Sequence, residues 1–600
     1  MQDIRSNAIA GSLRKVLSKA IQSSNPNAHR CIAVTLLGST VFLTTPLAHA
    51  QVGVGSERDA AEQRRALERE TQLREQQGRT PDIRLPKPPS EALRLLPDSE
   101  TPCFTIQQVE LRGEESARFV WILDALGGAD GLDSPQNKCL GAKGIALVLQ
   151  RAQDALVARG FVTTRVLAEP QDLSSGKLTL TVLPGRIRSI RFSEPVDPRA
   201  TAWNAVPAKP GDILNLRDIE QALENFKRVP TAEADIQIAP AEGDTALPGQ
   251  SDLLITYKQG MPLRLALSAD DSGSKSTGKY QGSITLSYDN WWTLNDLFYI
   301  SINQDLGGGD AGPRGTRGVT THYSVPWGNW LLASTVSHSS YDQTVAGINQ
   351  NYVYRGTSNN AELKLSRLLY RDSNRKTHLN LKAFARESHN FIDDTEVQVQ
   401  RRAVGGWELG VGHKEFIGQT TLEANLAYKR GTGAFGSLPA PEEAFGEGTS
   451  RFALVSADVS LNLPFKLGNQ SWRYNVNWRG QDNRTSLTPQ DRFAIAGRYT
   501  VRGFDGEASL SAESGWLIRN ELAAVLGNSA QEIYLGIDHG EVGGPSSSLL
   551  VGKRLTGMAI GLRGGFKNLQ YDVFIGAPLS KPTGFKTASS VAGFSVNVSF

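Results

Sequence analysis

Apolar and polar residues alternate in strand-like segments of about ten residues from Leu263 to the end of the chain. Segment 472–479 is the clearest case, because aromatic and apolar side chains occupy one face while arginine and asparagine occupy the other; segments 421–429 and 569–575 repeat the pattern. A water-soluble β-sandwich also alternates. Here the apolar face has aromatic ends and the opposite face carries several charges, which favours a transmembrane β-barrel with a polar lumen.

Counting these segments predicts a mainly β fold with sixteen antiparallel strands in residues 261–600, the sixth starting near Ala361. An even number is typical of bacterial outer-membrane barrels. Short connections such as "WGN" and "IGQ" alternate with long ones such as "DLGGGDAGPRGTR", as expected for periplasmic turns and external loops. The chain ends in "GFSVNVSF", which predicts a closing strand and a C-terminal barrel signal with four side chains on one face: Phe594, Val596, Val598 and Phe600.

Two small α+β domains are predicted before the barrel, at residues 102–186 and 187–260. Each has the order strand, helix, strand, strand; the helices are "GAKGIALVLQRAQDALVARG" and "NLRDIEQALENFKRV", with apolar residues at helical spacing. Each domain has a strand that could lie at an exposed sheet edge. Such an edge could bind an extended chain, or the domains could simply space the barrel from its surroundings.

The N-terminal region predicts export from the cytosol. Residues 1–50 combine a basic stretch, a short apolar run and a final "AHA", as in a cleaved signal peptide, with a membrane anchor as the alternative. Residues 51–78 contain a helix, Ser56 to Gln77, that is charged on every face; it is either a solvated linker helix or a helix inside a water-filled lumen. Residues 79–101 form a proline-rich linker.

Two cysteines, Cys103 and Cys139, remain once the predicted signal peptide has removed Cys31. An even pair outside the cytosol predicts one disulfide bond. Two free thiols are the alternative, and a metal site is less favoured because no histidines cluster with them.

Composition and motifs indicate neither an enzyme nor a nucleic-acid-binding protein. The net charge is only +3 and both signs are interspersed, so no nucleic-acid surface is expected. Segment "GSKSTGKY" at 273–280 nearly matches a phosphate-binding loop, but it precedes a strand rather than a helix, so we expect a flexible first outer loop. The chain has no HExxH or GxSxG motif. We therefore predict no catalytic residues, no metal and no cofactor.

Several stretches make the chain resemble the two-partner secretion transporters (TpsB), the haemolysin secretion/activation family. They are "ETPCFTI" with "KCLGAKGI", "GFVTTRVLAEPQDLSSGKLTLTVLPGRI", and "GRYTVRGFDGE" followed by "LGIDHG". The resemblance covers essentially the whole chain after the signal. It implies two periplasmic POTRA domains, a plug helix at 51–78 and a sixteen-stranded outer-membrane barrel.

The resemblance also implies a site inside the barrel. The sixth outer loop, at about 493–514, would fold back into the lumen, and its arginine would pair with an aspartate of the barrel wall. The implied loop residues are Tyr499, Val501, Arg502, Gly503 and Phe504, and the implied wall residues are Asp538 and Gly540. The family often has an aromatic residue two positions before the aspartate, where this chain has Gly536.

The function implied is ATP-independent secretion of a large TpsA-type exoprotein, captured unfolded by the POTRA domains and threaded through the lumen. Outer-membrane lipid and the barrel-assembly machinery are the other partners implied. The alternatives are an outer-membrane insertase, a passive porin and a surface adhesin. The sequence does not identify the cargo, which could be an adhesin, a haemolysin, a contact-dependent toxin or a haem-binding protein.

Overall fold

The computed structural model describes residues 48–78, 80–85, 95–128, 130–244, 247–527 and 529–600. The chain divides into two compact units, Met1–Gly53 and Val54–Phe600. Most of the predicted signal peptide, Cys31 included, lies outside the described residues, as does part of the predicted linker. Among the helices of the described ranges, none combines the length and apolar character that crossing a membrane requires.

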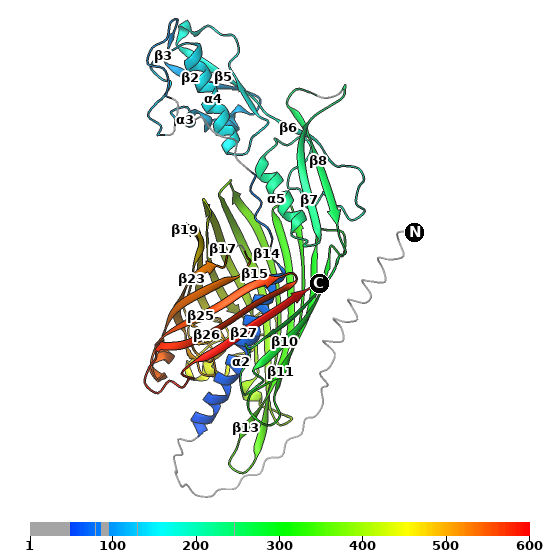
Figure 1. The fold of residues 1–600 in the computed structure, drawn as a ribbon, viewed down its shortest axis with the longest axis vertical. Coiled ribbons are helices and arrows are strands. Elements are labelled where there is room, and N and C mark those ends of the chain that lie inside the picture. The colour runs from blue at the N-terminus through cyan, green and yellow to red at the C-terminus, as the bar shows by residue number, and fades with distance from the viewer. Residues whose placement is uncertain (1–47, 79, 86–94, 129, 245–246, 528) are drawn as a thin grey trace, which may run out of the picture. The chain divides into compact units, whose positions relative to one another are not determined.

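Within the described ranges, sixteen long antiparallel strands form a closed barrel in which the last strand, β27, pairs with the first, β9 (Figure 1). The predicted fold class is therefore confirmed. A two-residue strand, β16 (Thr395–Glu396), extends the tip of β15. The sixteen strands are β9 (Leu263–Asp270), β10 (Tyr280–Asp289), β11 (Leu297–Gly307), β12 (Gly315–Trp327), β13 (Trp330–Ala346), β14 (Asn351–Arg371), β15 (Arg375–Ile392), β17 (Arg402–Ile417), β18 (Thr420–Thr432), β19 (Ala453–Leu467), β20 (Gln470–Asn483), β23 (Ser514–Val525), β24 (Glu532–Gly543), β25 (Arg554–Phe566), β26 (Leu569–Ser580) and β27 (Val591–Ser599).

One strand boundary differs clearly from the prediction. Strand β14 begins at Asn351, whereas the sequence pattern places its start near Ala361. Segment 351–360 contains glycine and several asparagines, which are depleted in strands. This segment nevertheless pairs with β13 up to the pair Ala346↔Asn351. The hydrogen bonds of this hairpin satisfy the backbone N–H and C=O groups of the segment, which keeps it in the strand.

The barrel strands bury polar residues and expose apolar ones. In β10, Gln281, Thr285 and Asp289 are buried, while Ile284 and Leu286 are exposed. This is the reverse of a water-soluble sheet, and it fits a polar lumen with lipid outside. On β27 the same alternation puts Phe594, Val596, Val598 and Phe600 on the lipid-facing side: Val598 lies opposite Leu267, and Phe600 exchanges backbone hydrogen bonds with Leu265.

The first small domain comprises β1 (Phe104–Ile106), β2 (Gln108–Gly113), α3 (Ile122–Ala125), β3 (Lys138–Leu140), α4 (Ala142–Ala158), β4 (Arg165–Leu167) and β5 (Lys177–Leu183). Its main sheet has the order β2-β5-β4, and β1 pairs with β3. Helix α4 packs its apolar side, including Val148 and Leu156, on the core. The predicted disulfide is confirmed: Cys103 is bonded to Cys139.

The second small domain comprises β6 (Arg186–Phe192), α5 (Leu216–Lys227), β7 (Ala232–Pro240) and β8 (Gln250–Gln259), with sheet order β6-β8-β7. Asn215 caps α5 by accepting a hydrogen bond from the backbone N–H of Arg217. Phe226 of α5 packs in the core beside Tyr257 of β8. Strand β8 leads directly into β9 of the barrel, so this domain adjoins the periplasmic turns.

The N-terminal helix, α2 (Ala48–Gln77), starts earlier than the predicted Ser56. Its side chains contact the inner wall of the barrel in the middle of the helix and near its C-terminal end. Tyr341 of β13 donates a hydrogen bond to Asp59 (3.1 Å), and Arg74 pairs with Glu362 of β14 (3.0 Å). Of the two predicted environments, a solvated linker and the lumen, these contacts match the lumen. Figure 1 shows the later part of the helix, in blue, running inside the barrel.

Candidate functional site

The connection between β20 and β23, residues 484–513, folds inward and packs on the barrel wall. Two short strands within it, β21 (Phe493–Ile495) and β22 (Leu510–Ala512), pair with each other and form the stem of the loop. Apolar side chains of the stem and tip make a compact cluster with wall residues of β23, β24 and β25. The cluster contains Phe493, Ile495, Val501, Phe504, Leu510, Ala512, Leu517, Val542, Leu555 and Phe585.

Arg502 at the tip of this loop binds Asp538 of β24 through three hydrogen bonds. Its Nε and Nη2 donate to the two carboxylate oxygens at 2.7 and 2.9 Å, and its backbone N–H donates to Oδ2 at 3.0 Å. Asp538 is fully buried and Arg502 is 4% exposed. A bidentate arginine–carboxylate pair of this kind fixes orientation as well as distance.

Glu521 of β23 is a second carboxylate partner that sequence reasoning missed. It accepts a hydrogen bond from Arg502 Nη1 at 2.7 Å and also pairs with Arg563 at 2.7 Å. The two arginines and two carboxylates form a network, which we call the loop anchor (Arg502, Glu521, Asp538 and Arg563). No signal along the chain singles out Glu521, because it lies opposite Gly536 only through the β23–β24 register.

Two glycines make room for the anchor. A Cβ at position 536 would lie 2.3 Å from Arg502 Nη2, so a larger residue there would clash with the guanidinium. Gly536, where the family often has an aromatic residue, therefore leaves the space that Arg502 occupies in this chain. Tyr534 is the lumen-facing residue two positions before Gly536, and the centre of its ring lies 5.8 Å from the guanidinium carbon of Arg502. Gly503 has φ +91°, and a Cβ there would lie 2.4 Å from the backbone oxygen of Ala577.

The remaining predicted residues also lie around the loop. Val501 is fully buried and contacts the wall near Gly540, where a Cβ would lie 3.0 Å from it. Phe504 packs edge-to-face on Phe585 at 5.8 Å. The backbone oxygen of Tyr499 accepts a hydrogen bond from Arg519 at 3.5 Å. The structure therefore brings all seven predicted residues to one part of the lumen.

Helix α2 contacts this loop and fills much of the space beside it. Arg65 donates to the backbone oxygen of Gly506 at 2.6 Å, and Arg64 donates to that of Pro489 at 2.9 Å. A cavity of about 320 Å³ remains beside the helix. That volume is at the lower end for a small-molecule pocket, so the helix and the inward-folded loop leave little free space at this level of the lumen.

The first outer loop is also folded against the helix. The sequence predicts a flexible loop at 273–280, but Ser274 is buried and donates a hydrogen bond to Glu62 of α2 at 2.9 Å. Burial against a helix that is remote in sequence overrides the glycine- and serine-rich composition of this segment.

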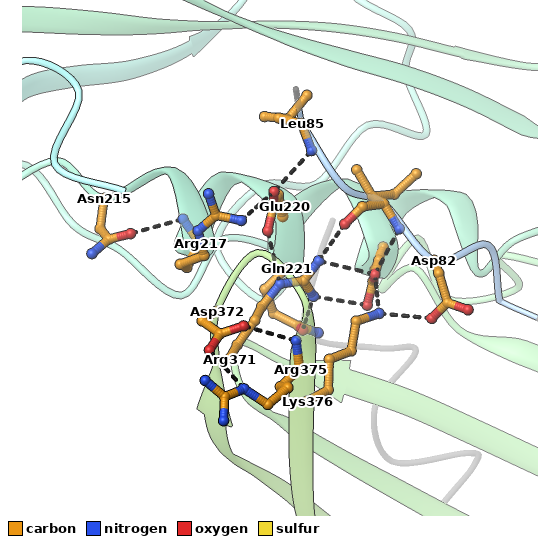
Figure 2. Close-up of polar contacts among 12 residues, drawn as sticks. Asp82, Leu85, Asn215, Arg217, Glu220, Gln221, Arg371, Asp372, Arg375 and Lys376 are labelled. Carbon is orange, nitrogen blue, oxygen red and sulfur yellow. Dashed lines mark hydrogen bonds and ion pairs between the residues drawn. The ribbon is translucent and has the colours of Figure 1, made fainter. Parts of the chain in front are cut away.

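A second ionic cluster ties the segment after α2 to the second small domain and to a barrel turn (Figure 2). Arg371, the last residue of β14, donates to Glu220 of α5 at 3.1 Å and to the backbone oxygen of Ile83 at 2.6 Å. The carboxylates of α5 in turn accept hydrogen bonds from linker backbone N–H groups: Glu224 from Ile83 and Glu220 from Leu85, both at 2.8 Å.

Lysines on the barrel complete this cluster. Lys376 pairs with Glu224 and, at 2.8 Å, with Asp82; Lys414 pairs with Asp82 at 2.7 Å. Hydrogen bonds from these two lysines outweigh the effect of burial, which alone would raise the pKa of Asp82, and hold that pKa below its usual value. We call this cluster the linker clasp (Asp82, Ile83, Leu85, Glu220, Glu224, Arg371, Lys376 and Lys414).

The profile of a protein family described as haemolysin secretion/activation protein ShlB/FhaC/HecB matches residues 249–564. The profile of a ShlB-type POTRA domain matches residues 104–185, and that of a POTRA domain matches residues 186–240. The chain belongs to this family. As a TpsB protein it is an outer-membrane β-barrel of a Gram-negative bacterium, and its two POTRA domains lie in the periplasm.

Individual relatives agree over most of their length. The chain is 36% identical over 552 residues to outer membrane transporter CdiB-2 of Burkholderia pseudomallei (strain 1026b), covering 89% of this chain and 92% of that protein. It is 25% identical over 521 residues to hemolysin transporter protein ShlB of Serratia marcescens, covering 85% and 88%. The solved structure of CdiB from Acinetobacter baumannii matches with a TM-score of 0.79 and 30% identity, covering 91% and 99%. These TpsB relatives are transporters.

Proposed function

We propose that this TpsB protein is an ATP-independent translocator that secretes a large partner exoprotein across the outer membrane. The observation that carries the proposal is a polar lumen occupied by a charged helix whose linker is tied to a POTRA domain. A route through the lumen would require α2 to leave, because the helix is hydrogen-bonded to the inward-folded loop and to the barrel wall and occupies the lumen between them. The charged groups on every side of α2 allow it to exist in water once it has left.

Capture of the unfolded partner would occur at the edges of the POTRA sheets. In the order β2-β5-β4 the short strand β4 lies at an edge, and its Leu167 is 45% exposed. In the order β6-β8-β7 the nine-residue strand β7 lies at an edge, next to the β-hairpin that joins it to β8. An extended chain can add to such an edge through backbone hydrogen bonds. Folding of the partner outside the cell would then make its passage directional.

We assign Arg502 and Asp538 the role of holding the sixth loop in the lumen during transport, and the C-terminal strand ending in Phe600 the role of a signal for the barrel-assembly machinery. Outer-membrane lipid would surround the apolar exterior formed by residues such as Leu267 and Val598. The domain limits proposed are 102–186 and 187–260 for the POTRA domains and 261–600 for the barrel.

Deletion of the chain in its own bacterium, followed by proteomics of medium and outer membrane, tests the proposal. Loss of one large secreted or surface protein, with other outer-membrane barrels unchanged, is the expected result and identifies the cargo. Depletion of many barrel proteins would instead show an insertase, and an unchanged exoproteome with reduced solute uptake would show a porin. Reconstitution of transport in lipid vesicles without nucleotide then tests ATP independence.

A further inference from the structure

The loop between β6 and α5 of the second POTRA domain lies against two periplasmic turns of the barrel. Asn204 donates hydrogen bonds to the backbone oxygens of Leu294 and Pro326 at 2.5 and 3.1 Å, and its own backbone oxygen accepts one from the N–H of Gly328 at 2.7 Å. Asn204 is 1% exposed. These contacts hold the neighbouring residue, Trp203, at the rim of the barrel.

Trp203 nevertheless leaves 68% of its surface exposed. A single exposed apolar residue is ordinary on a soluble surface. This one belongs to a group, because the two turns that bind its loop carry four further exposed tryptophans: Trp291, Trp292, Trp327 and Trp330. Trp327 lies on the same side of β12 as Val319, which faces lipid, and it is paired across the turn with Trp330. Tryptophans at this level of a barrel form the interfacial aromatic girdle.

Arg199 provides a second, independent contact between this loop and the lipid-facing surface. Its guanidinium lies 5.7 Å from the ring centre of Tyr288, and its Nη2 donates to the tyrosine hydroxyl at 3.2 Å. Tyr288 lies on the same side of β10 as Ile284 and Leu286, which point away from the lumen. The loop therefore reaches the outside of the barrel at the level where hydrocarbon gives way to headgroups.

We propose that residues 199–204 are a peripheral membrane contact whose partner is the phospholipid of the periplasmic leaflet. The indole of Trp203 lies among the headgroups as an extension of the aromatic girdle, and Arg199 lies at the level of the phosphates, which its guanidinium can bind. The second POTRA domain is thus held by lipid as well as by protein, and this sets its inclination to the membrane. The surface continues an established lipid-facing one, which favours lipid over a protein partner.

Depth measurements by spin labelling test this proposal. The full chain carrying Cys31→Ser and Trp203→Cys is labelled with a nitroxide and placed in nanodiscs of phosphatidylethanolamine and phosphatidylglycerol; Cys103 and Cys139 are protected by their disulfide. Leu247→Cys is the matched control, because Leu247 is 65% exposed but lies in the hairpin at the opposite end of the same sheet. We expect a label at 203 to be several-fold less accessible to a water-soluble nickel chelate, and more accessible to oxygen, than one at 247.

Equal accessibility at the two sites would overturn the proposal, and so would protection at 203 that appears only when another protein is added. A second measurement keeps the native side chain. Lipids brominated near the headgroup should quench the tryptophan fluorescence of the unaltered chain more than that of Trp203→Phe, which retains the other nine tryptophans. Identical quenching would contradict lipid contact even if the labelled variant were perturbed.

Discussion

The loop anchor and the linker clasp are both built around a buried arginine, yet they hold their segments differently. The side chain of Arg502 is 5% exposed and that of Arg371 is 3% exposed. Each arginine pairs with two carboxylates. Around Arg502 the loop also packs an apolar cluster of ten buried residues among those described. Around Arg371 the linker is held mainly by hydrogen bonds from Ile83 and Leu85, although both residues also touch the edge of the POTRA core.

This difference indicates different lifetimes. A segment with a large buried apolar surface loses several kcal/mol when it is pulled out, at about 25 cal/mol per Å². A segment held mainly by hydrogen bonds to charged groups exchanges them for water at a net cost of about 1.5–3 kcal/mol each, and it exposes less apolar surface when it leaves. We infer that the anchor is the permanent element of the lumen and the clasp is the releasable one. The predictions below, from the largest expected effect to the smallest, test that contrast.

Arg502→Ala should abolish most secretion of the partner while the barrel still assembles. It removes the bidentate partner of the fully buried Asp538, which keeps a 3.7 Å ion pair with Arg519, so we expect a loss of up to about 3–5 kcal/mol. Secretion is measured in the medium and assembly by heat-modifiable migration on gels. Asp538→Ala should behave alike, and the double variant should be no worse than either single one. Undiminished secretion would remove the role assigned to the pair.

Gly503→Ala should weaken secretion to nearly the same degree. Its Cβ would lie 2.4 Å from the backbone oxygen of Ala577, and the backbone has φ +91°. Gly506→Ala is the control, because φ there is +75° but the nearest atom is 3.6 Å away. Equal secretion by the two variants would show that the close packing of Gly503 against the barrel wall does not position the loop.

Arg371→Ala should release the linker and let α2 leave the lumen more often. Glu220 keeps Arg217 as a partner, so we expect a loss of about 1–3 kcal/mol rather than the full cost of an unpaired buried charge. Conductance through planar bilayers should rise and the linker should be cut sooner by protease. Arg375→Ala, at the start of β15 across the same turn, is the control, because that side chain is 49% exposed and pairs with Asp372. Equal conductance in the two variants would show that the clasp does not restrain the helix.

The clasp should also loosen at acidic pH, with the smallest effect of the four. The pKa of Asp82 is lowered from its usual value of 3.8, so its ionised form stabilises the bound linker fully above that value and is lost as the pH falls below it. Protease sensitivity of the linker should therefore stay constant from about pH 8 to pH 5 and rise below about pH 4. Asp82→Asn should be more sensitive than the unaltered chain at neutral pH. A transition near pH 6 would point to a different group.

The barrel could be predicted from the sequence because its pattern is local. Within each segment of about ten residues, apolar side chains that face lipid alternate with polar side chains that face the lumen. The alternation of short and long connections then indicates which end of each strand lies in the periplasm. The predicted start of β14 was wrong because its first ten residues are held as a strand by pairing with β13 and, from Tyr354 on, with β15. Arg502 and Asp538 of the anchor could be predicted from the resemblance to the family. Glu521 could not, because only the register of β23 on β24 brings it beside them.

The sequence by itself therefore determined the membrane-spanning architecture, the two α+β domains and the disulfide, which depend on periodicity, helix and strand order, and cysteine count. The tertiary structure alone decided the linker clasp, the seating of the first loop on α2 and the position of Trp203 at the rim. These features join segments roughly 90 to 330 residues apart. Charges and exposed rings on such segments look like ordinary solvated surface until the fold brings their partners beside them.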